Sequence, residues 1–223
     1  MKTKRILIFH CAFFLLPLLA FCQQPPKVGK VIDTFNGVNV YYNGSVRNVS
    51  SRHLAPDGYN LGLKYQCVEF VKRYYYEFLK HKMPNSYGHA KDFYIKKLKD
   101  GAHNKARNLT QYTNPSKEKP KVNDLIVFGH RPDNPFGHVA IVSKVNAQDI
   151  EIVQQNCGVE SRINIPLTFK DKRWKIDRID ALGWLRKVQA KPKPLNTTPQ
   201  KQTQKQTQKN HTSDTKKRIK QIQ

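Results

Sequence analysis

Cysteine is scarce in this sequence, and its scarcity excludes a disulfide-stabilised scaffold. The 223 residues contain four cysteines. Two of them, Cys11 and Cys22, lie in an N-terminal segment that we expect to be removed, which leaves Cys67 and Cys157. Two isolated cysteines in a domain of this length do not make a disulfide framework. A disulfide between them is the alternative in an oxidising compartment, whereas we favour a free thiol at Cys67 and a small buried residue at Cys157.

Acidic residues are also few. The sequence has 16 Asp and Glu residues against 40 Lys and Arg residues, for a formal net charge of +24 at pH 7. Such a chain is attracted to anionic polymers, among them cell-wall polymers, lipid headgroups and nucleic acid. A basic-aromatic motif for nucleic-acid recognition is lacking, so we expect no specific nucleic-acid partner.

Long apolar runs are lacking, apart from residues 6–20. This run is shorter than the roughly 20 apolar residues of a membrane-spanning helix. Basic residues precede it, and the small residues Ala20 and Cys22 occupy positions −3 and −1 of a cleavage site before Gln23. The pattern is that of a secretory signal peptide.

We therefore expect residues 1–22 to be a signal peptide. The mature protein would be secreted, periplasmic or on the cell surface, and at most peripheral to the membrane. A lipoprotein with an acylated Cys22 is the less favoured alternative, because Phe21 is too large for that signal.

Apolar residues almost disappear near the C-terminus. From Lys187 onward the chain has ten Lys or Arg residues and one Asp, with repeats of Lys-Gln-Thr-Gln. Such a composition cannot build a core, so residues 190–223 are predicted to be a basic, disordered tail. Residues 23–189 remain as one globular domain, which we expect to be monomeric.

Hydrophobic periodicity within this domain predicts an α+β fold class. Val68, Val71 and Tyr75 have the spacing of one face of an amphipathic helix. Further along the chain, short apolar segments bounded by turn residues predict strands. The expected elements are helices at residues 66–80 and 90–98, strands at residues 38–42, 124–128, 138–145, 150–156, 163–165 and 182–185, and a polar loop at residues 109–121. Helices followed by a run of antiparallel strands are typical of α+β domains.

Cys67 is the first candidate for chemistry, because it lies at the start of the predicted helix. Unpaired N–H groups and the helix dipole favour negative charge there. That position is expected to lower the pKa of the thiol and to favour the thiolate, which is the nucleophile. Such a nucleophile requires a base elsewhere in the chain.

His138 is the candidate base. It opens the predicted strand Gly137-His138-Val139-Ala140-Ile141-Val142, on a rigid element. Residues 150–156 are its predicted hairpin partner, and side chains alternate between faces along a strand. With an even pairing register, Gln154 or Asn156 would lie beside the imidazole and fix its tautomer. The alternative is that both amides face solvent.

These motifs together resemble the CHAP family, the cysteine, histidine-dependent amidohydrolases and peptidases of the NlpC-like and papain-like group. The resemblance rests on five strings: Lys64-Tyr65-Gln66-Cys67-Val68-Glu69-Phe70, Asp124-Leu125-Ile126, Gly137-His138-Val139-Ala140-Ile141-Val142, Gln155-Asn156 and Gly183-Trp184-Leu185-Arg186. The form Gln-Cys-Val-Glu-Phe is most similar to the amidase domain of glutathionylspermidine synthetase/amidase. The resemblance implies a papain-like fold in which N-terminal helices pack on an antiparallel β-sheet.

The resemblance also implies roles for individual residues. Cys67 would be the nucleophile, His138 the general base and then acid, and Gln66 with the Cys67 backbone N–H the oxyanion hole. The family's third catalytic group is usually acidic and lies two residues before an asparagine; here Gln154 occupies that position and Asn156 is kept. A neutral amide can orient the imidazole but cannot stabilise its charged form. Neither a cofactor nor a metal is expected, because the loop before Cys67 offers Asp57 alone among acidic residues.

Three functions follow as hypotheses. The leading one is an exported amidase or endopeptidase that hydrolyses amide bonds of cell-wall peptidoglycan, with this or another anionic wall polymer as its partner. The second is an amidase acting on a small glutathionylspermidine-like amide. The third is a catalytically inactive binding module on the same fold, in which Gln154 marks the loss of activity.

Overall fold

The computed structural model describes residues 24–188. The predicted signal peptide at residues 1–22 and the predicted tail at residues 190–223 lie outside the described residues. Within the described residues, no helix is long and apolar enough to cross a bilayer. In chain order the strands are β1 (Val31–Phe35), β2 (Val38–Tyr41), β3 (Ser51–Leu54), β4 (Asn60–Lys64), β5 (Ala102–Asn104), β6 (Leu109–Thr113), β7 (Leu125–Phe128), β8 (His138–Val145), β9 (Asp149–Val153), β10 (Arg162–Lys170), β11 (Arg173–Ile176) and β12 (Ala181–Arg186).

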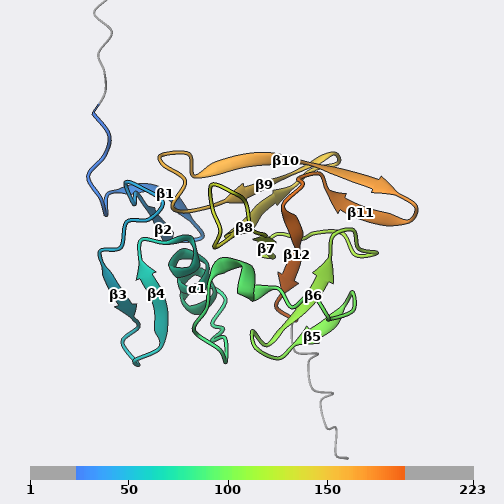
Figure 1. Ribbon diagram of the computed structural model, residues 1–223, viewed down its shortest axis with the longest axis horizontal. Coiled ribbons are helices and arrows are strands. Elements are labelled where there is room, and N and C mark those ends of the chain that lie inside the picture. The colour runs from blue at the N-terminus through green and yellow to red at the C-terminus, as the bar shows by residue number, and fades with distance from the viewer. Residues whose placement is uncertain (1–23, 189–223) are drawn as a thin grey trace, which may run out of the picture. The chain divides into compact units, whose positions relative to one another are not determined.

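One large sheet dominates the fold. Its eight strands are ordered β11-β10-β9-β8-β7-β12-β6-β5, and each neighbouring pair is antiparallel. Two separate two-stranded sheets, β1-β2 and β3-β4, precede it in the chain. The helix α1 (Cys67–Glu77) follows β4 directly and packs beside β4 and β8 (Figure 1).

The predicted fold class is wrong. An α+β, papain-like arrangement with N-terminal helices packed on a sheet requires more than one helix. The part of the chain that the structure describes has α1 as its one α-helix, together with the short 3-10 helix η1 (Ala90–Phe93). The fold is mostly β, built on the eight-stranded antiparallel sheet.

The second predicted helix, at residues 90–98, fails for a reason that lies in tertiary hydrogen bonds. After η1 the backbone becomes extended at Tyr94. The buried side chain of Gln111 then accepts a hydrogen bond from the Ile95 N–H at 2.9 Å and donates one to the Ile95 carbonyl at 2.9 Å. Both backbone groups of Ile95 are therefore used across the fold and are unavailable to a helix.

Two segments predicted as loops are strands. β6 lies within the predicted polar loop at residues 109–121, and its buried residues Leu109 and Gln111 alternate with the partly exposed Thr110 and Tyr112. β4 lies in the loop predicted before Cys67. In both segments polar side chains occupy buried positions, so the sequence carries little apolar alternation to reveal the strand.

The hairpin predicted to hold the base is confirmed. β8 spans His138–Val145 as predicted, and β9 is its antiparallel partner. Ile141 pairs with Val153, which is an even register. β9 ends at Val153, so Gln154 continues the same alternation and Asn156 lies beyond the strand.

The core lies on both faces of the central strands. One face of β7 and β8 packs against the buried side of α1, and the side chains on the other face form a second cluster with residues of the sheet strands β9, β10, β11 and β12. The first cluster includes Phe70, Val71, Tyr74, Val127, Val139 and Ile141. The second includes Ile126, Phe128, Ala140, Val142, Ile152 and Trp184.

A buried carboxylate joins α1 to the end of β9. Glu69 is fully buried, and it accepts hydrogen bonds from Arg73 Nε at 2.6 Å and from Gln155 Nε2 at 2.8 Å. His53 Nδ1 lies 2.8 Å from the same carboxylate. Burial alone would raise the pKa of Glu69, but the hydrogen bonds and the charge of Arg73 outweigh it and hold the pKa below its ordinary value.

Removing this charge should destabilise the fold. Glu69→Gln keeps the size of the side chain but leaves Arg73 buried without its carboxylate. We expect the free energy of unfolding at pH 7, measured by urea denaturation, to fall by about 3 kcal/mol. Glu77→Gln is the control, because Glu77 is exposed on the same helix; its effect should stay within about 0.5 kcal/mol.

The pH dependence gives a second check on this carboxylate. Because folding lowers the pKa of Glu69 from 4.5, its stabilisation is present above that pH and is lost as the pH falls through the folded-state pKa. The difference between wild type and Glu69→Gln should therefore shrink on acidification. A difference that stays constant down to low pH would contradict a role for the charge.

Candidate active site

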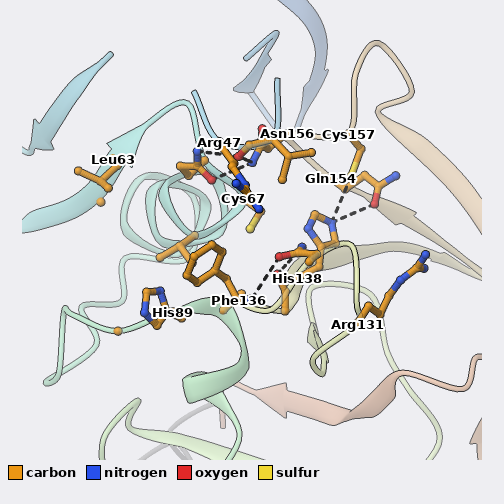
Figure 2. A pocket seen from close by; sticks show the side chains of 18 of the residues that line it. Arg47, Leu63, Cys67, His89, Arg131, Phe136, His138, Gln154, Asn156 and Cys157 are labelled. Carbon is orange, nitrogen blue, oxygen red and sulfur yellow. Dashed lines mark hydrogen bonds between the residues drawn. The ribbon is translucent and has the colours of Figure 1, made fainter. Parts of the chain in front are cut away.

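A cleft of about 1000 Å³ opens where the start of α1 meets the start of β8. Cys67, His138 and Gln154, which the sequence predicts to act together, all line it. Figure 2 shows the sulfur of Cys67 and the ring of His138 facing each other across the cleft. Asn156 and Gln66 also contribute to its walls. The structure therefore brings every predicted site residue to one place.

Cys67 is the first residue of α1. The first backbone hydrogen bond of the helix runs from the Phe70 N–H to the Gln66 carbonyl. The N–H groups of Cys67 and Val68 have no backbone acceptor among the described residues, as expected at a helix start.

His138 is the first residue of β8 and follows Gly137. Gly137 has φ of 74°, and a Cβ there would lie 2.5 Å from the Phe128 carbonyl oxygen. Glycine is therefore required for the chain to pass this close to β7. The ring of Phe128 stacks on the imidazole with centroids 5.9 Å apart, which supports one orientation of His138.

Gln154 is the residue that orients His138. Its Oε1 lies 3.0 Å from His138 Nε2, and its own Nε2 donates to the Glu160 carbonyl at 3.2 Å. The second bond fixes which end of the amide faces the imidazole. Since Oε1 can only accept, His138 must carry its proton on Nε2, and Nδ1 is left with a lone pair on the Cys67 side.

Asn156 does not contact His138. Its φ of 69° places it in the left-handed region, so the chain turns away after the end of β9. Its Nδ2 donates to Gln66 Oε1 at 2.8 Å and to the Val46 carbonyl at 3.0 Å, and its Oδ1 accepts from Asn43 at 2.7 Å. Strand alternation predicted that Gln154 or Asn156 would lie beside the imidazole of His138. Gln154 is the one that makes the contact.

The side chain of Gln66 is occupied in this structure. Its Nε2 donates to the Asn48 carbonyl at 2.7 Å and to the Val46 carbonyl at 3.1 Å. Both N–H groups are used in these bonds, so Gln66 presents no unbonded N–H to the cleft. The backbone N–H groups at the start of α1 are the donors available to an oxyanion.

Cys157 is a cleft residue that the sequence argument left out of the site. Its Sγ lies 3.6 Å from His138 Nε2, next to the Gln154 contact. Cys67 and Cys157 are both free thiols, so the alternative of a disulfide between them is not what the structure contains. Cys157 directly follows Asn156 in the sequence. This position was the signal that could have placed Cys157 in the site, because Gln154 and Asn156 were already candidate site residues.

Burial sets the protonation of the two central groups. It raises the pKa of the Cys67 thiol to about 11, although backbone hydrogen bonds oppose the shift. It lowers the pKa of His138 to about 4, against the hydrogen bond with Gln154, which raises it. The predicted lowering of the Cys67 pKa at the helix start is therefore wrong, because desolvation outweighs the helix N–H groups. At neutral pH the site holds a thiol and a neutral imidazole.

No group of three or more His, Cys, Asp or Glu side chains among residues 24–188 is arranged to hold a metal ion. The expectations of no metal and no cofactor stay predictions.

The raised pKa of Cys67 predicts slow alkylation at neutral pH. Because the thiolate fraction grows about tenfold per pH unit below the pKa, the rate with iodoacetamide should still rise at that pace between pH 7 and 9. The measurement is mass spectrometry of the Cys67 peptide, with N-acetylcysteine as the unperturbed control. A rate that levels off near pH 7 would contradict the buried neutral thiol.

Gln154→Glu should raise the pKa of His138 from about 4. A carboxylate in place of Oε1 stabilises the imidazolium, by about 1–3 pKa units. The shift can be measured by NMR titration of the imidazole. Loss of the hydrogen bond to the Glu160 carbonyl should cost about 1 kcal/mol of stability. Gln148→Glu adds the same charge at an exposed position of the β8–β9 turn; equal His138 pKa values in the two variants would refute the contact.

Comparison with known proteins identifies the segment that carries this site. Residues 57–156 match the sequence model of the CHAP domain. Glutathionylspermidine synthase from Crithidia fasciculata is 36% identical over 140 residues, which cover 56% of this chain and 19% of that protein. Trypanothione synthetase from the same organism is 28% identical over 179 residues, covering 71% of this chain and 27% of that protein.

A solved structure described as "The crystal structure of Ly7917" covers 45% of this chain and 38% of its own, with 20% identity and a TM-score of 0.27, a likeness too low to support an argument. The matches span 19% and 27% of the two curated relatives, so the activities of those whole proteins are not transferred to this chain. The CHAP match contains Cys67, His138 and Gln154 and ends at Asn156. Residues 57–156 are therefore a CHAP domain, and this match supports hydrolase activity on amide bonds.

Proposed function

We propose that this protein is an exported cysteine amidase or endopeptidase that hydrolyses amide bonds of cell-wall peptidoglycan. The observation that carries the chemistry is the hydrogen bond between His138 Nε2 and Gln154 Oε1, at 3.0 Å. It fixes the imidazole with its basic Nδ1 on the side of Cys67, within a cleft large enough for a peptide. Cys67 and His138 line the same cleft, as a thiol nucleophile and its base require, and no hydrogen bond joins them among the described residues.

The reaction begins from the neutral pair. As Cys67 Sγ bonds to the substrate carbonyl carbon, its proton passes to His138 Nδ1, and the carbonyl oxygen becomes an oxyanion near the Cys67 N–H. The imidazolium then gives this proton to the leaving amine, and the C–N bond breaks to leave a thioester. Water transfers a proton to His138 and attacks the thioester, which releases the acid and returns the thiol.

The neutral Gln154 affects one step of this reaction, the formation of the His138 imidazolium. Its Oε1 accepts from the Nε2–H of the imidazolium, so it supports the charged intermediate through a dipole and not through a full charge. The proton therefore passes from Cys67 to His138 during the attack, and no thiolate–imidazolium pair exists before the substrate reacts. We expect a slower enzyme than one with a carboxylate at this position.

The substrate class follows from charge and from the predicted signal peptide. The net charge of +24, of which +3 lies in the predicted signal peptide, favours an anionic polymer, and the basic C-terminal residues would hold the enzyme on it. An exported amide hydrolase on an anionic wall meets peptidoglycan stem peptides as its abundant amides. Export and the wall substrate are proposals that rest on the sequence.

A second candidate is an amidase for a small glutathionylspermidine-like amide. It is favoured by the likeness to a protein named glutathionylspermidine synthase, 36% identical over 140 residues. A third candidate is an inactive binding module, which the raised pKa of Cys67, about 11, and the neutral Gln154 favour. Digestion of peptidoglycan, hydrolysis of glutathionylspermidine and binding to peptidoglycan, measured together, separate all three.

Purified peptidoglycan should release soluble fragments when incubated with the mature protein. Mass spectrometry of the digest identifies the bond that is cut. Cys67→Ala should reduce the rate by at least about 1000-fold, because it removes the nucleophile. Cys157→Ala is the matched control, since it removes the other thiol of the cleft but not the nucleophile, and it should retain activity within about tenfold.

Three other results would contradict the proposed function or support another candidate. Release of fragments that is equal in wild type and Cys67→Ala contradicts thiol catalysis. Hydrolysis of glutathionylspermidine without release from peptidoglycan supports the second candidate. Binding to peptidoglycan with no hydrolysis of either substrate supports the inactive module.

A further inference from the structure

The arginines of the cleft fall into two groups. Four arginine side chains line it: Arg47, Arg52, Arg131 and Arg178. Two of them have acidic partners. Arg178 Nε lies 2.7 Å from Asp180 Oδ1, and Arg131 Nε lies 3.0 Å from Asp133 Oδ1. The charge at that end of the cleft is therefore largely compensated within the protein.

Arg47 and Arg52 differ from them. Neither has a carboxylate partner among residues 24–188, and both are exposed. The guanidinium of Arg52 donates to Asn60 Oδ1 at 3.0 Å and lies 5.8 Å from the ring centroid of Tyr87. In Figure 2, Arg47 lies on the Cys67 side of the cleft and Arg131 lies beyond His138. The uncompensated positive charge thus belongs to the wall that carries the nucleophile.

The backbone around Arg47 is fixed from both sides. The Val46 carbonyl accepts from Gln66 Nε2 and from Asn156 Nδ2, at 3.1 and 3.0 Å. The Asn48 carbonyl accepts from Gln66 Nε2 at 2.7 Å and from Asn43 Nδ2 at 3.0 Å. Gln66 immediately precedes the nucleophile, so these bonds hold the backbone of Arg47 at a set place relative to Cys67.

We propose that Arg47, assisted by Arg52, binds a free carboxylate of the substrate near the scissile amide and so makes the protein selective for acidic amide substrates. An exposed guanidinium without an internal partner forms charge-assisted, bidentate hydrogen bonds with a carboxylate. The fixed backbone lowers the ordering cost of binding, which then falls on the arginine side chain alone. The compensated arginines at the other end of the cleft have no such free charge.

This proposal rests on the proposed amide hydrolysis, so its test separates binding from turnover. The probes are two peptidoglycan stem peptides, one with free side carboxylates and the other with the same carboxylates converted to carboxamides. Their Kd values are measured by calorimetry with Cys67→Ala, which binds but does not cleave. We expect the free acid to bind roughly tenfold more tightly at low salt and the preference to weaken at high salt.

Variants of Arg47 test whether this residue causes the preference for the free acid over the carboxamide. Arg47→Gln in the Cys67→Ala background should bring the two Kd values together, and Arg47→Lys should retain part of the difference. Arg131→Gln is the matched control, since Arg131 lines the same cleft but is paired with Asp133; it should leave the preference unchanged.

Equal Kd values for acid and carboxamide, or no binding of either peptide, would overturn the proposal. A preference that survives Arg47→Gln would also overturn it, because the carboxylate would then be bound elsewhere. Failure of the proposed function gives a different result, in which the acid is preferred in binding but the protein with Cys67 intact cleaves neither peptide.

Discussion

The hydrogen bond between Gln155 and the buried carboxylate of Glu69, at 2.8 Å, is the contact on which the site depends. Cys67 lies two residues before Glu69 on α1, and Gln154 lies one residue before Gln155 at the end of β9. The same Gln155 Nε2 also reaches the Gln66 carbonyl at 3.1 Å. One buried amide therefore sets the distance between the segment that carries the nucleophile and the segment that orients its base.

Desolvation has the largest effect on the pKa values of Cys67 and His138. A helix start stabilises an anion through a few partial charges, but the thiolate of the buried Cys67 would lose more solvation energy than those charges return. Burial acts on Cys67 and on His138 in opposite directions and leaves both uncharged at neutral pH. With a neutral amide as the third group, the site forms charge during the reaction itself, when the substrate has displaced the remaining water.

The sequence predicted which residues meet in the cleft better than it predicted the architecture. Cys67, His138 and Gln154 could be found because a helix start and strand alternation are local properties. Asn156 lines the cleft but does not contact the imidazole, because the chain turns at its positive φ after the end of β9, which periodicity does not locate. The helix expected at residues 90–98 is absent because Gln111, distant in the chain, binds both backbone groups of Ile95. Non-local hydrogen bonds of this kind leave no periodic signal.

The loop around Arg47 has a consequence for how the cleft is filled. Its two flanking carbonyls are held by amide side chains that also flank the catalytic residues, so the loop cannot swing open without releasing Gln66 and Asn156. The entropic cost of ordering this wall falls on folding and not on binding. A substrate therefore meets a preorganised surface, and a rigid, extended peptide should be accommodated at a lower cost than a flexible one.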